Sequence, residues 1–478
     1  MTSANSAGAL PLQSRIQKPS HVRYVVMLFL CVLSFLTYFD RVGIMRAQGD
    51  MQRDLHISDA QMGWIFSVFW GAYALFEIPG GWLGDRFGAR STLTRIVFAW
   101  SLFTALTGSA VGFASLFTYR LLFGIGEAGA FPNIARVQWR WLPASAQGRA
   151  SGFIWLMARW GGAFSPVIFG SLLRLLGHHS VHAALAKVPL LDKLNYLPSW
   201  GLVFWVSGLF GIAWILLFYP WFRDNPAEHP SVNAGELAKI GPGATNTHRP
   251  VYDARVWKQL LTDSNLWFVS LYYAFGSFTW SFFVSWLPRF LKQVHHLDYA
   301  KSEWRQGMPL FFGGISCLLG GSISDLIIKK TGRMRFGRAF LPITGRLIAS
   351  VMILLAGFAH SPNVAIFFLC VCMLAHDLGQ GPSWATVVTV GGFYAGTAAG
   401  FVNTVTNLGG NFLQPILGER IFNHYGWHAL FIVYALIYFF SAATWLFINP
   451  ERTFYHDTAD ANGFPVVPLA QRDDKTNH

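Results

Sequence analysis

Long apolar stretches recur along almost the whole chain, and they constrain its fold more than any other feature. Each is about twenty residues long, enough for a helix to cross roughly 30 Å of hydrocarbon. Only 12% of the 478 residues are charged, whereas about 25% is usual for a soluble protein. A soluble chain of this length would have too few polar groups to cover its surface. The sequence therefore predicts an all-α protein that crosses a membrane many times.

We expect twelve membrane-spanning helices in two groups of six. The polar stretch between the groups contains Asn-Pro, His-Pro, Gly-Pro-Gly and Arg-Pro, which break helices and mark a linker. The predicted spans are 24–47, 60–82, 92–112, 115–139, 148–173, 201–221, 265–291, 304–328, 338–358, 363–390, 395–417 and 427–448. The predicted organisation is an N-terminal tail (1–23), a first half (24–221), a linker (222–264), a second half (265–448) and a C-terminal tail (449–478).

Lys and Arg in the loops predict the orientation in the membrane. With the N-terminus inside, the inward loops hold more of these residues than the outward loops, as the positive-inside rule requires. Residues 329–338 and the linker carry much of the excess. Both termini are therefore expected in the cytoplasm. The net charge of +13 lies in these short clusters, which does not indicate a nucleic-acid partner.

Two glycine-containing patterns repeat in the two groups of helices. The segment GRASGF at 148–153 recurs as GTAAGF at 396–401, and GWLGD at 81–85 recurs as GSISD at 321–325. Both repeats map the first six spans onto the second six. Two related six-helix halves are the architecture of a transporter that works by rocking one half against the other.

Several segments resemble the major facilitator superfamily. GGWLGDRFGAR at 80–90 is similar to the loop between helices 2 and 3 that marks this superfamily. YFDR at 38–41, RLLFGIGEAGAFP at 120–132 and WFRDNPAEHP at 221–230 resemble its anion:cation symporter branch. That branch includes bacterial sugar-acid/proton symporters of the galactonate, glucarate and hexuronate type. The resemblance implies the twelve-helix major facilitator fold, a small organic anion as substrate, the proton gradient as driving force and no cofactor.

Two charged residues lie near the outward end of the first predicted helix. Neighbouring helical side chains diverge by about 100°. Arg41 therefore shares a face with Tyr38, three residues away, whereas Asp40 points elsewhere. We interpret Arg41 and Tyr38 as an anion-binding pair on a cavity and Asp40 as a separate titratable group. The alternative is that the helix ends early and both charges lie among lipid headgroups.

The fourth predicted helix carries Arg120 and Glu127. They lie on one stripe about 10 Å apart, too far for direct pairing, and Arg120 could snorkel to the outer interface. Burial raises the pKa of a carboxyl and a nearby arginine lowers it again, so an arginine that moves makes a proton switch. In the sugar-acid symporters that the chain resembles, the acids matching Asp40 and Glu127 carry protons, and the arginine matching Arg41 holds substrate. We assign Asp40, Arg120 and Glu127 to proton coupling; a fixed salt bridge is the alternative for Glu127.

Arg159 is expected near the middle of the membrane, about 16 Å into the fifth helix. Facing a cavity, it offers a planar fork suited to a carboxylate. Contact with substrate is our interpretation, and pairing with Asp40 or Glu127 is the alternative. His376 and Asp377 receive no role.

Polar and aromatic side chains in four other helices are weaker candidates for binding substrate. Each of the polar ones could equally bond between helices. The candidates are Tyr73, Tyr273, Ser383, Trp384, Asn403 and Asn407. Glu77 is interpreted as structural.

Charges at the ends of two helices resemble the inner gate of the superfamily, which holds the halves together in the outward-open state. The residues expected there are Asp85 with Arg86 and Arg90, and Asp325 with Lys329 and Arg333.

Motifs for catalysis are missing from the sequence. It contains no phosphate-binding loop, metal-ligand cluster or serine-nucleophile elbow. All four cysteines lie in apolar segments, which indicates neither disulfides nor a metal site. We therefore expect a transporter and no enzyme.

The sequence predicts a proton-coupled symporter of a sugar acid, monomeric and located in a bacterial plasma (inner) membrane. One alternative is a facilitator-type carrier of another carboxylate, an exchanger or an exporter; a remote one is a membrane sensor that does not transport. The outward loop 177–199, with His178, His179 and His182, is read as an insertion, or else as a cap on the outer vestibule.

Overall fold

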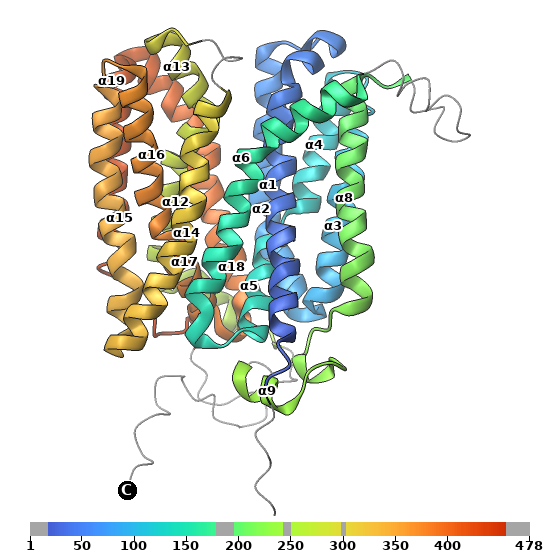
Figure 1. Ribbon diagram of the computed structural model, residues 1–478, viewed down its shortest axis with the longest axis vertical. Coiled ribbons are helices and arrows are strands. Elements are labelled where there is room, and N and C mark those ends of the chain that lie inside the picture. The colour runs from blue at the N-terminus through green and yellow to red at the C-terminus, as the bar shows by residue number, and fades with distance from the viewer. Residues whose placement is uncertain (1–17, 178–195, 242–249, 298–302, 456–478) are drawn as a thin grey trace, which may run out of the picture.

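The computed structural model describes residues 18–177, 196–241, 250–297 and 303–455, and the regular structure in these ranges is helical. The histidines of the predicted outward loop lie outside the described residues. Figure 1 shows two upright bundles of helices side by side. The first bundle contains α1 (Val22–Leu55), α2 (Asp59–Phe87), α3 (Ala89–Thr107), α4 (Phe113–Glu127), α5 (Ala130–Trp141), α6 (Gln147–Leu176) and α8 (Ser199–Trp221). The second contains α12 (Ser264–Ser281), α13 (Leu287–His295), α14 (Glu303–Thr331), α15 (Met334–Gly357), α16 (Pro362–Leu378), α17 (Gln380–Gly391), α18 (Ala395–Thr406) and α19 (Leu413–Thr444).

The fourth and tenth crossings of the membrane are each built from two helices. α4 ends at Glu127 and α5 begins at Ala130, because Gly129 between them has a φ of 86°. A Cβ atom at Gly129 would also lie 2.6 Å from Cα of Gly80, so both the backbone and the packing require glycine here. The continuous helix predicted over 115–139 is therefore wrong at this point. In the tenth crossing α16 and α17 are interrupted at Gly379.

Two π-helical turns interrupt crossings of the second bundle. η4 (Phe282–Trp286) joins α12 to α13, and η7 (Asn407–Phe412) joins α18 to α19. Such turns occur frequently at functional sites. Neither turn was predicted from the sequence.

The long helix α19 contains parts of two crossings. Gly426 has a φ of 74° and a ψ of −171°, so the chain turns there. Residues 413–425 complete the eleventh crossing and residues 427–444 form the twelfth. Within the described residues, five helical stretches are long and apolar enough to cross a membrane by length and composition alone. The other crossings run alongside them (Figure 1). The predicted all-α fold of twelve membrane helices is confirmed.

The repeated glycine patterns form the packing surfaces between the two bundles. α2 packs against α18, and α6 packs against α14. A side chain at Gly81 would overlap the carbonyl of Gly396, and a side chain at Gly321 would overlap the carbonyl of Gly148. Each pattern of one half therefore meets the other pattern in the opposite half, which explains why both recur.

The linker contains a 3₁₀ turn, η3 (Pro226–Glu228), and two short helices, α9 (Ala234–Ile240) and α11 (Ala254–Thr262). Glu236 on α9 accepts hydrogen bonds from the backbone N–H groups of His21 and Arg23, at 3.0 and 3.1 Å, and pairs with the Arg23 guanidinium at 2.6 Å. A carboxylate at the start of a helix is favoured by the helix dipole. This contact fixes the linker at the end of the bundle where α1 begins (Figure 1).

Candidate functional site

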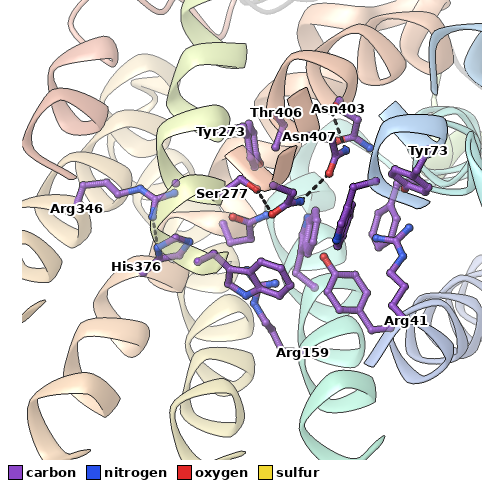
Figure 2. A pocket seen from close by; sticks show the side chains of 18 residues that line it. Arg41, Tyr73, Arg159, Tyr273, Ser277, Arg346, His376, Asn403, Thr406 and Asn407 are labelled. Atoms are coloured by element: carbon purple, nitrogen blue, oxygen red, sulfur yellow. Dashed lines mark hydrogen bonds between the residues drawn. The ribbon is translucent and has the colours of Figure 1, made fainter. Parts of the chain in front are cut away.

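A cavity lies between the two bundles, and both bundles contribute to its wall (Figure 2). Three arginines from three different helices line it, together with aromatic rings and a row of amide and hydroxyl groups. The lining side chains are Tyr38, Arg41, Trp70, Tyr73, Phe131, Trp155, Arg159, Tyr273, Gly276, Ser277, Trp280, Arg346, His376, Gln380, Asn403, Thr406, Asn407 and Asn411. Aromatic walls with a few convergent polar groups are typical of small-molecule sites.

Arg41 on α1 forms a buried ion pair with Glu127 at the end of α4. Its Nε–H is shared between the two carboxylate oxygens, at 3.0 and 3.1 Å. The Nη2 group has no hydrogen-bond partner among the described residues. The guanidinium lies over the rings of Tyr73, at 4.2 Å, and Tyr38, at 5.2 Å. Arg41 therefore faces the cavity with donors to spare while Glu127 lies behind it.

Asp40 and Arg120 lie beside this pair and away from the cavity wall. Asp40 is 4% exposed, and its Oδ1 has no hydrogen-bond partner among the described residues. Arg120 is 2% exposed and its guanidinium lies over the ring of Phe123, at 4.4 Å. The expectation that Arg120 could reach the outer interface is wrong in this structure, because its side chain packs inward on aromatic rings. Asp40, Arg41, Arg120 and Glu127 together form what we call the first-half charge cluster.

Arg159 on α6 pairs with Asp377 on α16. Its Nε donates to Oδ2 at 2.7 Å and its Nη2 donates to Oδ1 at 2.8 Å. Both side chains are buried, at 4% and 0% exposure. The alternative partners considered from the sequence, Asp40 and Glu127, are wrong, because the acid comes from the opposite bundle. Arg159 nevertheless lines the cavity.

The second half also contributes a basic residue, Arg346, to the cavity, and the sequence analysis did not predict it. Arg346 on α15 is 1% exposed and lies in the wall of the cavity. Its Nη1 contacts Nδ1 of His376, which also lies 2.8 Å from the hydroxyl of Tyr438. The reasoning that singled out Arg159, a charge deep in an apolar span, applies equally to Arg346 and would have found it.

A row of hydrogen-bonded polar groups runs along α18 and η7. Asn411 accepts from Ser277, at 2.9 Å, and donates to the side chain of Asn407, at 2.8 Å. The side-chain amide of Asn407 donates to the backbone carbonyl of Asn403, at 2.8 Å. The side-chain amide of Asn403 in turn donates to the carboxyl group of Glu77, at 3.3 Å. Asn403 and Asn407 were expected from the sequence. Asn411 and Ser277 were not, although Asn411 follows Asn407 by four residues, the same helical spacing that placed Asn403 and Asn407 on one face.

The remaining binding candidates divide into two groups. Tyr38, Tyr73 and Tyr273 line the cavity. Ser383 and Trp384 do not, because α17 packs them into the interior, where both are fully buried. The Trp384 ring meets Trp155 edge-on at 5.4 Å. The expectation that Ser383 and Trp384 contact substrate is therefore not met in this conformation.

Asp85 at the end of α2 binds the opposite bundle. It accepts from the backbone N–H of Thr397, at 2.7 Å, in the first turn of α18, and from Arg136, at 2.7 Å. The linker contributes Tyr252, whose hydroxyl donates to Asp85 at 2.9 Å. Burial raises the pKa of the Tyr252 hydroxyl, and the negative charge of Asp85 raises it further. This hydroxyl therefore keeps its proton.

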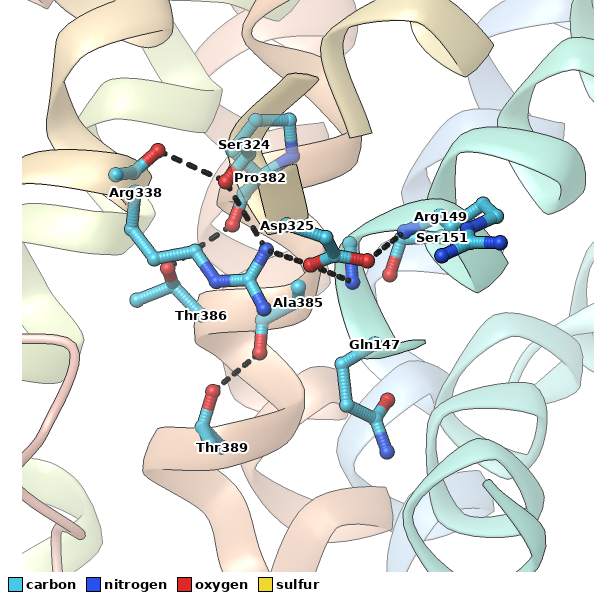
Figure 3. A network of polar contacts seen from close by, with 12 residues as sticks. Gln147, Arg149, Ser151, Ser324, Asp325, Arg338, Pro382, Ala385, Thr386 and Thr389 are labelled. Atoms are coloured by element: carbon cyan, nitrogen blue, oxygen red, sulfur yellow. Dashed lines mark hydrogen bonds and ion pairs between the residues drawn. The ribbon is translucent and has the colours of Figure 1, made fainter. Parts of the chain in front are cut away.

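Asp325 at the end of α14 makes the symmetry-related contact (Figure 3). It accepts from the backbone N–H groups of Gly148 and Arg149, at 3.1 and 2.8 Å, in the first turn of α6. Arg338 donates to it at 3.0 Å. The two aspartates thus cap helix N-termini of the opposite bundles, where the helix dipole favours a negative charge.

The basic partners predicted for these aspartates are corrected by the structure. Arg86 lies over the ring of Trp82, and Arg90 donates to the carbonyl of Tyr219 at 2.8 Å. Lys329 and Arg333 are exposed. Arg86 and Lys329 lie in the last turns of α2 and α14, and Arg90 and Arg333 lie where the following helices begin. Arg136 on α5 and Arg338 on α15 pair with the two aspartates instead.

Metal ligands do not gather in the described parts of the chain, where no group of three or more His, Cys, Asp and Glu side chains is suitably placed. The site is therefore defined by its arginines, its amide row and its ion pairs.

Two bundles of six crossings around a central cavity define a membrane transporter. The family model of the Major Facilitator Superfamily matches residues 30–413, and the chain belongs to this superfamily. It is a multi-pass membrane transporter, and the expectation that it is no enzyme is confirmed.

Relatives with named substrates cover almost the whole chain. A protein named as a probable sulfoacetate transporter of Cupriavidus necator is 29% identical, over 90% of this chain and 95% of its own. A probable galactarate/D-glucarate transporter of Bacillus subtilis is 30% identical, over 86% and 88%. A D-galactonate transporter of Escherichia coli is 28% identical, over 84% and 90%. The resemblance to sugar-acid transporters of the superfamily is confirmed.

Solved structures show the same fold. A proton:xylose symporter has a TM-score of 0.65 at 15% identity, over 89% of this chain and 96% of its own. A bacterial homologue of the lysosomal transporter Spinster, in an inward-facing conformation, has a TM-score of 0.61 at 21% identity, over 89% and 98%.

Proposed function

We propose that this protein is a symporter that carries a small organic anion, of the sugar-acid class, together with protons. The observation that carries the proposal is the ion pair between Arg41 and Glu127 at the cavity wall. The Arg41 guanidinium faces the cavity and the Glu127 carboxylate lies behind it. The Nη2 group of Arg41 has no hydrogen-bond partner among the described residues. The names of the relatives, which include galactonate and galactarate/D-glucarate transporters, support the substrate class.

Coupling follows from competition for Arg41. A substrate carboxylate that binds the guanidinium weakens its contact with Glu127, and a buried carboxylate without a cation is costly. Glu127 then gains a proton, which restores neutrality in the membrane. Asp40, buried in the same first-half charge cluster with one oxygen that has no partner among the described residues, gives the proton a further site. Binding of the anion therefore favours uptake of a proton.

Alternating access uses the contacts of Asp85 and Asp325. Both lie at the end of the bundles that carries the linker and hold the two halves together there. We place this end in the cytoplasm of a bacterial cell, with both termini on the same side. Release of substrate to the cytoplasm then requires both aspartates to leave the helix N-termini of the opposite bundle.

Uptake by proteoliposomes tests the proposal. Vesicles of purified protein receive radiolabelled D-galactonate or D-glucarate, with the outside more acidic than the inside. We expect accumulation above the external concentration, abolished by a protonophore. Equilibration without accumulation would instead favour a facilitator or an exchanger.

A further inference from the structure

Arg346 differs from the other arginines of the cavity in what balances its charge. Arg41 contacts Glu127 and Arg159 contacts Asp377. Both oxygens of Asp377 accept from Arg159. Within the described ranges, Arg346 has no carboxylate within 4.0 Å. A buried guanidinium without a counter-charge is costly inside a membrane, so this site calls for an anion from outside the protein.

His376 does not supply that counter-charge. An arginine side chain has donors only. The Nδ1 atom of His376 that contacts Nη1 of Arg346 must therefore accept, which makes the imidazole neutral with its proton on Nε2. That Nε2 lies 3.8 Å from Oδ1 of Asp377. The ring orients Arg346 and leaves its positive charge intact.

The surroundings of Arg346 hold its guanidinium at the cavity wall. The ring of Tyr272 lies 4.6 Å away and that of Tyr438 lies 5.5 Å away. A side chain at Gly276 would overlap Nη2 of Arg346, so the absence of a side chain there lets the guanidinium reach the cavity. The Nε group has no hydrogen-bond partner among the described residues. An anion site requires a buried cationic group that is held in place and has N–H donors available, and the Arg346 guanidinium meets these requirements.

Figure 2 shows Arg346 and Arg41 at opposite ends of the cavity, with Ser277 between them. We propose that Arg346 is a second anion subsite and that the substrate carries two acidic groups, one at each end. The role of Arg41 in this statement rests on the proposed function. Carboxylate and sulfonate groups both fit the chemistry of the subsite. The amide and hydroxyl row at Ser277, Asn407 and Asn411 suits hydroxyl groups between the two acids.

Two matched ligands test this subsite on the purified full-length protein. D-Glucarate has an acid at both ends, and D-gluconate has an acid at one end of the same carbon chain. Isothermal titration of wild type should give a dissociation constant about tenfold or more lower for D-glucarate, as expected for one extra charge-assisted contact. Arg346→Gln should reduce this ratio to about twofold or less, since one anion site would then remain. Arg335→Gln, which removes an exposed arginine of the same helix, should leave the ratio unchanged.

Two further arms keep the test decisive. Gly276→Ala retains the charge but displaces the guanidinium, and it should lower the ratio as Arg346→Gln does. If Arg346→Gln does not fold, this variant decides the matter. Sulfoacetate carries a carboxylate and a sulfonate. If wild type binds sulfoacetate and not D-glucarate, sulfoacetate becomes the two-acid ligand of the test. Arg346→Gln should then weaken the binding of sulfoacetate at least tenfold.

The outcomes separate this inference from the proposed function. Equal binding of the one-acid and two-acid ligands by wild type, or an unchanged ratio in a folded Arg346→Gln variant, would overturn the second subsite and leave a proton-coupled carrier of monoanions intact. A preference for two acids that depends on Arg346, without proton-driven accumulation, would support the subsite and refute the coupling.

Discussion

Arg159 and Asp377 join the two halves of the transporter through two parallel hydrogen bonds, 2.7 and 2.8 Å long, in the centre of the protein. The contact links α6 to α16 with almost no exposure to solvent. The Arg41–Glu127 pair differs, because a single N–H group of the arginine serves both oxygens. We therefore regard Arg159–Asp377 as the firmer pair and Arg41–Glu127 as the one that opens.

Removing one partner of the Arg159–Asp377 pair should destabilise the protein strongly. Asp377→Ala leaves a buried guanidinium unpaired, at a cost of roughly 3–5 kcal/mol. Arg159→Ala and the double variant complete a cycle, and the double variant should lose much less than the two single variants combined. Melting temperatures in detergent measure this. Additive losses would show that the two residues are not coupled.

Arg41 should dominate binding of the anion in the first half. Arg41→Ala should weaken binding by roughly 1.5–3 kcal/mol, the contribution of a charge-assisted hydrogen bond. Arg41→Lys should recover only part of this, because lysine lacks the planar fork. Titration with a sugar acid measures both variants, with Arg335→Gln as the control. Wild-type affinity in Arg41→Ala would place the site elsewhere.

Closure between the bundles should depend on the glycine contacts. Gly81 and Gly71 lie in the same helix, α2, but a side chain at Gly81 meets the backbone of α18, whereas one at Gly71 meets nothing within 4 Å. Gly81→Ala should destabilise the closed state by about 1–3 kcal/mol and slow transport. Gly71→Ala should be tolerated. Equal transport rates in proteoliposomes for the two variants would contradict the packing of α2 on α18.

Orientation can be tested with two single cysteines. Ser231 lies in the linker, and Val111, which is 88% exposed, lies between α3 and α4 at the opposite end of the first bundle. The four native cysteines are buried. A membrane-impermeant maleimide should label Ser231→Cys only after permeabilisation of cells and Val111→Cys without it. The reverse pattern would invert the proposed topology.

Much of the fold could be predicted from local sequence, because the length of an apolar stretch and the position of a charge within it are local properties. Tyr38 and Arg41 lie three residues apart, and helical spacing sufficed to place them on one face. Asp377 could not be paired with Arg159, because the two residues are 218 positions apart and their meeting depends on how the halves pack. The break at Gly129 likewise lies against a residue distant in sequence, Gly80 of α2.

Neutralising the acids of the first-half charge cluster tests the central claim most directly. We compare proteoliposomes of wild type, Asp40→Asn and Glu127→Gln in two assays: accumulation driven by a pH gradient, and exchange of labelled for unlabelled sugar acid. A pH gradient supplies about 1.4 kcal/mol per proton and per pH unit, but only to a carrier whose empty and loaded forms differ in protonation. Each variant should lose accumulation, and at least one should retain exchange, which needs no proton cycle. Normal pH-driven accumulation in both variants would contradict coupling through Asp40 and Glu127.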